Sequence, residues 1–381
     1  MSRMTSLDDL DLFSDEILAD PYPCYAALRE QAAAVYLPKT GVWAVTRYEA
    51  VRAALGNPQA FSSRAVAFND VMNQALAGTS LAADPPDHRA LRAALMENLT
   101  PRALRTLRDD VEAKADAMVA GLVERGTFDA IEDLAQALPV AVVMDLIGVQ
   151  GEIRDKMLGW GFAAFNTLGP MNARTIANLP AAGELFDWVS GIKAADLAEG
   201  SIGRAVFAAA ERGVIPAASC NGIIHQYVAA GLDSTIAGLG NAIALFAAHP
   251  DQYALIRADP SLIPAAFNEV LRYDAPVPLF GRLVTAGTEV DGTVIPAGAQ
   301  AALLFAAGNR DPRHYQDPDR FLVERNPVDH LGFGYGIHSC AGRGLASLEA
   351  QAVLGALARR VRGYTVGPGE RRVSNSTRSL A

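Results

Sequence analysis

A single cysteine set among glycines is the most chemically suggestive feature of this chain. Cys340 lies in the segment Phe333–Gly342, and four glycines fall within the eleven residues 334–344. Glycine permits positive φ angles and lets the main chain approach a flat ligand closely. A helical pattern follows from Arg343, so we expect free N–H groups and the helix dipole to stabilise a thiolate and to lower the pKa of Cys340. The segment is therefore compatible with a thiolate that binds a metal.

Two simpler interpretations compete with a thiolate ligand. A lone cysteine inside a cell is usually a small buried hydrophobe. A zinc site built from His338 and Cys340 would need two further ligands, and neither Cys24 nor Cys220 has a neighbouring Cys or His at a suitable spacing. The three cysteines form no even, closely spaced set, which favours a reducing compartment over a disulfide framework.

The longer pattern Phe-Gly-x-Gly-x-His-x-Cys-x-Gly, followed by Leu345-Ala346, resembles at every fixed position the haem-ligand motif of the soluble bacterial cytochromes P450. Further segments resemble this family in the same chain order, from about Pro21 to Ala358. The resemblance implies haem b with Cys340 as its metal ligand and Phe333 and Gly342 as cofactor-binding residues. It also implies a mainly α fold with small β-sheets, in which the haem lies between a long central helix and the helix after the cysteine loop.

The segment Ala230–Thr235 resembles the oxygen-binding stretch of the family, with Ala230 beside the cofactor. Asp233, Ser234 and Thr235 are its catalytic candidates, and Ser234 departs from the family's usual threonine. A helical hydroxyl can bond back to the preceding turn and loosen it. Serine lacks the methyl group that fixes the rotamer, so hydrogen peroxide could leak during proton delivery. Asp233 lies in an apolar stretch, which predicts a raised pKa and a role in a proton relay.

Four basic residues match positions that hold the haem propionates in similar bacterial enzymes: His88, Arg92, Arg282 and His338. Carboxylates in a site that excludes water need such cationic partners. Glu269 and Arg272 resemble the family's Glu-x-x-Arg helix, and Arg320 matches the arginine that completes this ion network. An i, i+3 spacing places the first two on one helix face. An exposed helical ion pair is the alternative for these two residues.

Position relative to these motifs predicts an apolar substrate cavity. It would be lined by Phe165, Leu168, His225, Gln226, Ala229, Pro278, Leu279 and Phe280. The stretch 165–170 and the surroundings of Gly240-Asn241 resemble bacterial members that oxidise small aromatic acids, including by O-demethylation. The loop from Ala65 to Ala83, which should cover the cavity, contains no Lys or Arg, so a neutral phenol or aryl ether is as well supported as a benzoate.

The chain contains no motif for a flavin, a nicotinamide or an iron–sulfur cluster, so the electrons must come from outside. The resemblance implies a ferredoxin with an NAD(P)H-dependent reductase, and Arg89, Arg102, Arg105 and Arg343 are candidates for its docking patch. Two alternatives remain open. One is a peroxide-driven haem-thiolate peroxygenase, for which Ser234 leaves room, and the other is a non-catalytic haem sensor.

Composition favours a small-molecule ligand. The chain has 381 residues, half of them apolar, and shows neither a repeat nor a linker, so we expect one domain over 1–381 with an acidic segment at about 1–20. The net charge is −9 without any basic block, which argues against nucleic-acid and anionic-membrane partners. The N-terminus lacks the pattern of a signal peptide. We expect a cytoplasmic monomer that acts on a small molecule with O2.

Helix signals dominate the chain. Thr100-Pro101 begins a helix that Gly126 ends, and Asp84-Pro85-Pro86 is expected to begin another in the same way. Strand signals are confined to Val42–Thr46 and to Arg282–Phe305, with turns at Asp291-Gly292 and 296–298. The stretch 179–203 cannot be assigned. The most apolar helix, about 216–249, contains enough polar residues that a buried central helix is favoured over a membrane span.

Overall fold

The computed structural model describes residues 6–149, 151, 153–367 and 371–380, and these form a mainly helical molecule with small sheets. The N-terminal acidic segment is described from residue 6 onward; within it Leu12 and Phe13 are buried. The helices are α1 Asp15–Ala19, α2 Tyr22–Gln31, α3 Tyr48–Leu55, α4 Asp70–Ala75, α5 Asp87–Met96, α6 Pro101–Arg125, α7 Ala137–Ile147, α8 Ile153–Asn166, α9 Ala173–Gly191, α10 Ile202–Glu211, α11 Cys220–Gly231, α12 Asp233–Ala248, α13 Pro250–Ala258, α14 Ile263–Tyr273, α15 Phe305–Asn309 and α16 Arg343–Arg360.

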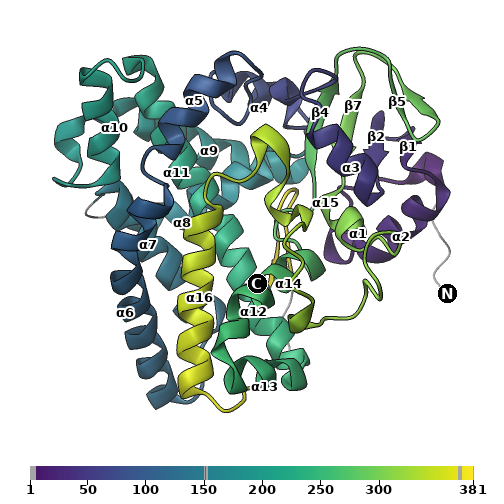
Figure 1. Cartoon of the computed structure of the whole chain (residues 1–381). Coiled ribbons are helices and arrows are strands. Elements are labelled where there is room, and N and C mark those ends of the chain that lie inside the picture. The colour runs from purple at the N-terminus through teal and green to yellow at the C-terminus, as the bar shows by residue number, and fades with distance from the viewer. Residues whose placement is uncertain (1–5, 150, 152, 368–370, 381) are drawn as a thin grey trace.

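The strands form three small sheets. They are β1 Ala34–Leu37, β2 Val42–Val45, β3 Phe61–Ser62, β4 Phe280–Val284, β5 Thr288–Val290, β6 Thr293–Ile295, β7 Gln300–Leu303, β8 Arg371–Val373 and β9 Arg378–Leu380. The largest sheet has the order β1-β2-β7-β4-β3, and the pairs β5-β6 and β8-β9 are hairpins. Most of the helices fill one side of the molecule, and the five-stranded sheet lies at the other side together with α1, α2, α3 and α15 (Figure 1).

Local sequence explains the long helix α6. The side chain of Thr100 accepts a hydrogen bond from the Ala103 N–H at 3.3 Å, Pro101 opens the helix, and Gly126 ends it with a φ of 78°. This helix is as predicted. It packs along α16, so the helix that follows the cysteine loop is held against a rigid neighbour (Figure 1).

The predicted start of α5, the helix before α6, at Asp84-Pro85-Pro86 is wrong. Helix α5 begins at Asp87 after Pro86, and Asp84 does not cap it. The Asp84 carboxylate instead accepts hydrogen bonds from the Ser62 hydroxyl at 2.6 Å and from the Ser63 N–H at 2.9 Å. It therefore fastens the end of β3 to the loop before α5.

The long apolar stretch forms two helices in place of one. Helix α11 ends at Gly231 and α12 begins at Asp233, and the main chain at Leu232 (φ −95°, ψ −77°) departs from helical geometry. The segment Ala217–Ala248 has the length and hydropathy of a membrane span, but 78% of its most apolar window is buried inside the protein. Its apolar composition is accounted for by the core.

Two further predictions about elements need correction. Strands are not confined to two places, because β1, β3, β8 and β9 lie outside them. The unassigned stretch 179–203 contains the end of α9 and a short 3-10 turn, Ala194–Asp196, before α10 begins at Ile202. The turn at Asp291-Gly292 is as predicted, with φ angles of 46° and 81°.

Candidate active site

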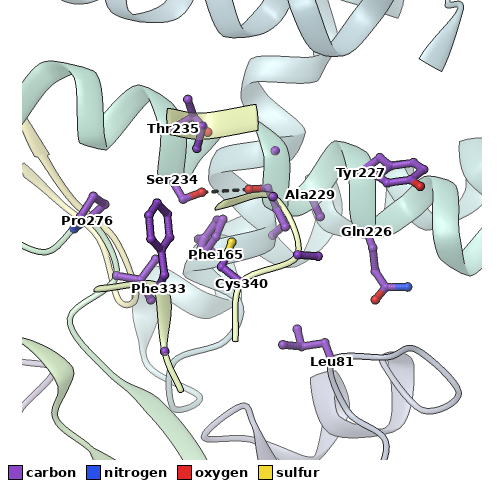
Figure 2. A pocket seen from close by; sticks show the side chains of 18 of the residues that line it. Leu81, Phe165, Gln226, Tyr227, Ala229, Ser234, Thr235, Pro276, Phe333 and Cys340 are labelled. Atoms are coloured by element: carbon purple, nitrogen blue, oxygen red, sulfur yellow. Dashed lines mark hydrogen bonds between the residues drawn. The ribbon is translucent and has the colours of Figure 1, made fainter. Parts of the chain in front are cut away.

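The cysteine loop has the backbone that its glycines predict. Gly334 and Gly336 have φ angles of 66° and 70°, and a Cβ on Gly336 would lie 2.8 Å from the Leu55 carbonyl oxygen. The Cys340 N–H donates to the Phe333 carbonyl at 2.7 Å, which closes the loop. The sulfur therefore projects from a tightly folded turn into a cavity (Figure 2).

The expected low pKa of Cys340 is wrong for the protein alone. The side chain is exposed to the cavity, but the surrounding protein removes enough hydration to raise the pKa of this thiol. The N–H groups of Gly342 and Arg343 and the charges of Arg92 and Arg343 offset that effect only in part. Helix α16 begins at Arg343, three residues after the cysteine, so its dipole acts from further away than expected. A bound metal cation is the group that would favour the thiolate here.

One cavity of about 270 Å³ runs from the cysteine loop to the junction of α11 and α12. At one end it is bounded by Cys340 and Gly342, and at the other by Ala230, Ser234 and Thr235. Its walls are mostly apolar side chains. Figure 2 shows the Cys340 sulfur on one side of this space and Ser234 with Ala229 on the other.

The Ser234 hydroxyl donates to the Ala230 carbonyl at 2.9 Å, which is the bond to the preceding turn expected from the sequence (Figure 2). It occurs where the helix is interrupted at Leu232. Asp233 does not line the cavity and is not in apolar surroundings. Its buried carboxylate is ion-paired with Arg372 and accepts a hydrogen bond from the Thr377 hydroxyl at 2.7 Å, both residues belonging to the C-terminal hairpin region.

A cluster of basic groups lies beside Cys340. The rings of His88 and His338 have centroids 4.3 Å apart, and both Nε2 atoms are buried without a hydrogen-bond partner among the described residues. Arg282 is 4% exposed, and burial lowers its pKa to about 10. The negative charge of Asp84 raises this pKa, but it offsets the effect of burial only in part. Arg92 donates to the Ser339 carbonyl. Buried donors without an acidic partner fit an anionic group such as the propionates of a haem.

The predicted ion network is present with one change of residue. Glu269 and Arg272 are fully buried and paired at 2.7 Å, so the alternative of an exposed pair is wrong. Arg320 does not complete the network, because its side chain is 67% exposed and lies 3.8 Å from Asp317. Arg325 takes that place, with its Nε 3.3 Å from the Glu269 carboxylate. A 3-10 turn at Val323–Arg325 brings it there.

Six of the eight predicted pocket residues line the cavity: Phe165, Leu168, His225, Gln226, Ala229 and Phe280. Pro278 and Leu279 do not; Leu279 is buried in a separate apolar cluster, and the Pro278 carbonyl accepts the Ala306 N–H. Pro276 and Val277 line the cavity in their place.

Several residues that line the cavity were not predicted from the sequence. Met72, Leu76, Ser80 and Leu81 come from the loop that was expected to cover the cavity. That loop is tied to the α8–α9 turn, because the Asn69 amide donates to the Thr167 and Gly169 carbonyls at 2.8 and 2.7 Å.

Glu349 of α16 also lines the cavity. It is buried, its Oε2 has no partner among the described residues, and burial raises its pKa to about 8. Glu349 lies on the same helix face as the apolar residues 345, 348 and 352, and this spacing could have identified it from the sequence.

Comparison with known proteins assigns the family. A family model described as cytochrome P450 matches residues 220–363. Cytochrome p450 CYP199A2 of Rhodopseudomonas palustris is 37% identical over 97% of this chain and 92% of its own length. This chain belongs to the cytochrome P450 family. PikC, a P450 monooxygenase of Streptomyces venezuelae, is 33% identical over 95% of this chain and 89% of its own length.

Solved structures agree with this family. CalO2 superposes with a TM-score of 0.87 at 28% identity, covering 98% of this chain and 97% of its own. The P450 CREJ, in complex with (4-ethylphenyl) dihydrogen phosphate, gives 0.88 at 25% identity and covers 98% of both chains. The protein is therefore a P450 monooxygenase, an oxidoreductase whose cofactor is haem b, and its fold is the P450 fold that the cysteine loop predicts.

Proposed function

We propose that this P450 inserts one oxygen atom from O2 into a small aromatic substrate, by hydroxylation or O-demethylation, with electrons from a ferredoxin. The observation that carries the proposal is the continuous apolar cavity between Cys340 and the Ala230–Ser234 turn. A haem bound there through a thiolate supplies the activation of O2. The cavity walls exclude water and hold the substrate beside it.

The cofactor would be held by two sets of residues. Cys340 is the metal ligand, and Phe333, Ala230 and Gly342 border the cavity around it. His88, Arg92, Arg282 and His338 bind the propionates, which would satisfy the two orphaned imidazole nitrogens and the buried Arg282 charge. Ion pairing of this kind offsets the cost of burying both partners.

Protons would reach the cavity through Asp233 and the hydroxyls of Ser234 and Thr235. The Asp233 carboxylate faces the C-terminal hairpin, whereas Ser234 and Thr235 line the cavity. A proton taken up by Asp233 on the hairpin side can therefore be passed inward only when the carboxylate leaves Arg372. The Ser234 hydroxyl can accept a hydrogen bond from protonated Asp233 through its lone pairs. It can pass a proton inward only if its own O–H leaves the Ala230 carbonyl as the new proton arrives.

A small aromatic ring suits this cavity for two reasons. Phe165, Phe186 and Phe280 line it and offer ring faces and edges for stacking. The structurally similar P450 CREJ holds a single-ring ligand, (4-ethylphenyl) dihydrogen phosphate.

The electron donor would dock on a basic surface. Arg89 on α5, Arg102 and Arg105 on α6, and Arg343 at the start of α16 are all exposed, and α6 packs against α16. Exposed arginines can steer an acidic partner by electrostatic complementarity. We further propose that residues 1–381 act as one catalytic domain, as a cytoplasmic monomer.

The test is a reconstituted assay with NADH, a ferredoxin and its reductase. We expect product formation in proportion to NADH consumed, and slower turnover with hydrogen peroxide alone. Ser234 gives the peroxygenase alternative a specific basis, and faster turnover with peroxide would favour it. The absence of product from methoxyphenols, ethylphenols and benzoates by either route would favour a haem sensor.

A further inference from the structure

The cavity has an uncharged polar end that the proposed reaction does not use. Ser80, His225 and Gln226 line it. His225 and Gln226 lie on α11, one helical turn before Ala229 and Ala230 and so about 6 Å further along the helix axis. Figure 2 shows the Gln226 side chain pointing toward Leu81, away from Ser234. We name Ser80, His225 and Gln226 the polar end.

His225 has an unmet capacity for hydrogen bonding. It is 5% exposed, its ring stacks on Phe186 with centroids 4.3 Å apart and an interplanar angle of 18°, and its Nδ1 is buried without a partner among the described residues. Burial lowers its pKa to about 4. The imidazole is therefore neutral at physiological pH, with one nitrogen able to accept a hydrogen bond.

Ser80 and Gln226 add a second neutral contact. The Ser80 hydroxyl donates to the Gln226 Oε1, and the Gln226 amide donates to the Gly222 carbonyl at 2.9 Å. These bonds fix both side chains, yet they leave lone pairs on the Ser80 oxygen and one Gln226 N–H unused. The polar end therefore offers donors and acceptors without a net charge.

The charged groups of the cavity lie elsewhere. Among the described residues that line it, only Arg92, Arg282 and Glu349 are charged types. Arg92 donates a hydrogen bond to the Ser339 carbonyl of the cysteine loop, and Glu349 is on α16. Arg282 lies close enough to His338 for its charge to lower the pKa of that imidazole. A carboxylate placed at the polar end would lose its hydration without gaining a cation, which is strongly unfavourable, whereas a hydroxyl needs one neutral partner.

We propose that the polar end selects uncharged, hydrogen-bonding aromatic substrates, namely phenols whose O–H is accepted by His225, and excludes aromatic carboxylates. This specificity rests on the proposed function, because it orients the ring for attack at the Cys340 end of the cavity. His225 is then a specificity-determining residue that contacts substrate.

The experiment compares three ligands that share an ethyl-substituted ring: 4-ethylphenol, 4-ethylbenzoate and 4-ethyltoluene. Dissociation constants for the holoenzyme are measured by equilibrium dialysis, which reports binding without reference to the iron. We expect 4-ethylphenol to bind about tenfold more tightly than 4-ethyltoluene and about 100-fold more tightly than 4-ethylbenzoate. Equal or tighter binding of the benzoate would overturn the proposal.

The matched variant is His225→Phe, which keeps the ring and its stacking on Phe186 but removes both nitrogens. It should weaken 4-ethylphenol about tenfold and leave 4-ethyltoluene within about twofold. Equal weakening of both ligands would show that position 225 contributes only shape, and would contradict the proposal. His225→Lys should in turn bind 4-ethylbenzoate more tightly than the wild type does.

The carbon monoxide spectrum of each reduced protein distinguishes a failure of the proposed function from a failure of the polar-end assignment. A spectrum without the red-displaced Soret band of thiolate ligation defeats the proposed function, whatever the ligands do. A normal spectrum combined with the wrong order of ligands defeats only the assignment of the polar end.

Discussion

The buried ion network around Glu269 allows a comparison between two arginines that are five residues apart. The Glu269 carboxylate receives the Arg272 Nε and Nη2 at 2.7 and 2.8 Å, the Leu322 N–H at 2.9 Å and the Arg325 Nε at 3.3 Å. Arg325→Ala removes one of these four donors and one of the two cations. It also removes the bond from Arg325 to the Asp317 carbonyl at 3.0 Å.

We expect Arg325→Ala to cost about 2 kcal/mol of stability, because the carboxylate stays buried with a single cation. Arg320→Ala should change stability by less than about 0.5 kcal/mol, since that side chain is 67% exposed and its ion pair among the described residues, with Asp317, is 3.8 Å long. Glu269→Ala should cost about 3–5 kcal/mol, because it leaves the buried Arg272 without its carboxylate.

The assay is thermal unfolding of the holoenzyme followed by far-ultraviolet circular dichroism, with the three variants compared at one scan rate. Arg325→Ala should lower the midpoint by roughly 2–4 °C, and Arg320→Ala should match the wild type. If Arg320→Ala were as destabilising as Arg325→Ala, or if Arg325→Ala were neutral, the assignment of Arg325 to the network would be refuted.

Three further predictions concern protons. Asp233→Asn should lower product formation about 100-fold, and an unaltered rate in this variant would remove Asp233 from the relay. Arg372→Met frees the Asp233 carboxylate from its ion-pair partner and should change the solvent isotope effect on turnover. Ser234→Ala should divert more NADH to hydrogen peroxide and lower product per NADH about fivefold, whereas unchanged coupling would show that the hydroxyl is dispensable. Burial lowers the pKa of His330 to about 3, so between about pH 6.5 and pH 3 only the unfolded chain binds a proton at this residue, and the His330 contribution to stability should fall by about 1.4 kcal/mol per pH unit over that range. In urea titrations at pH 7 and 5, His330→Asn should remove this part of the loss and leave the part that comes from other buried histidines such as His225. An equal loss in the wild type and the variant would refute the assignment.

The sequence predicts those parts of the site that local chemistry determines. The glycines around Cys340 predict the positive φ angles found at Gly334 and Gly336, and the hydroxyl of Ser234 predicts the bond to the Ala230 carbonyl. The break between the two helices at Leu232 was not predicted, because the sequence analysis expected one continuous helix there. The i, i+3 spacing of Glu269 and Arg272 is likewise a local signal.

Contacts between distant segments could not be predicted in this way. The partners of Asp233 are Arg372 and Thr377, 139 and 144 positions further along the chain, and Gln226 lies 146 positions from Ser80. No periodicity encodes such pairs, because they depend on how the C-terminal hairpin and the covering loop pack on the central helices. Even Arg325 was missed, since a 3-10 turn decides which of two nearby arginines turns inward.

The most direct test of the central claim is the ferrous carbon monoxide spectrum of the wild type beside that of Cys340→Ser. With Cys340 as the metal ligand, the wild type shows the red-displaced Soret band of thiolate ligation and the serine variant loses it. A wild-type spectrum without that band, or a serine variant with an unchanged spectrum, would contradict the assignment of Cys340.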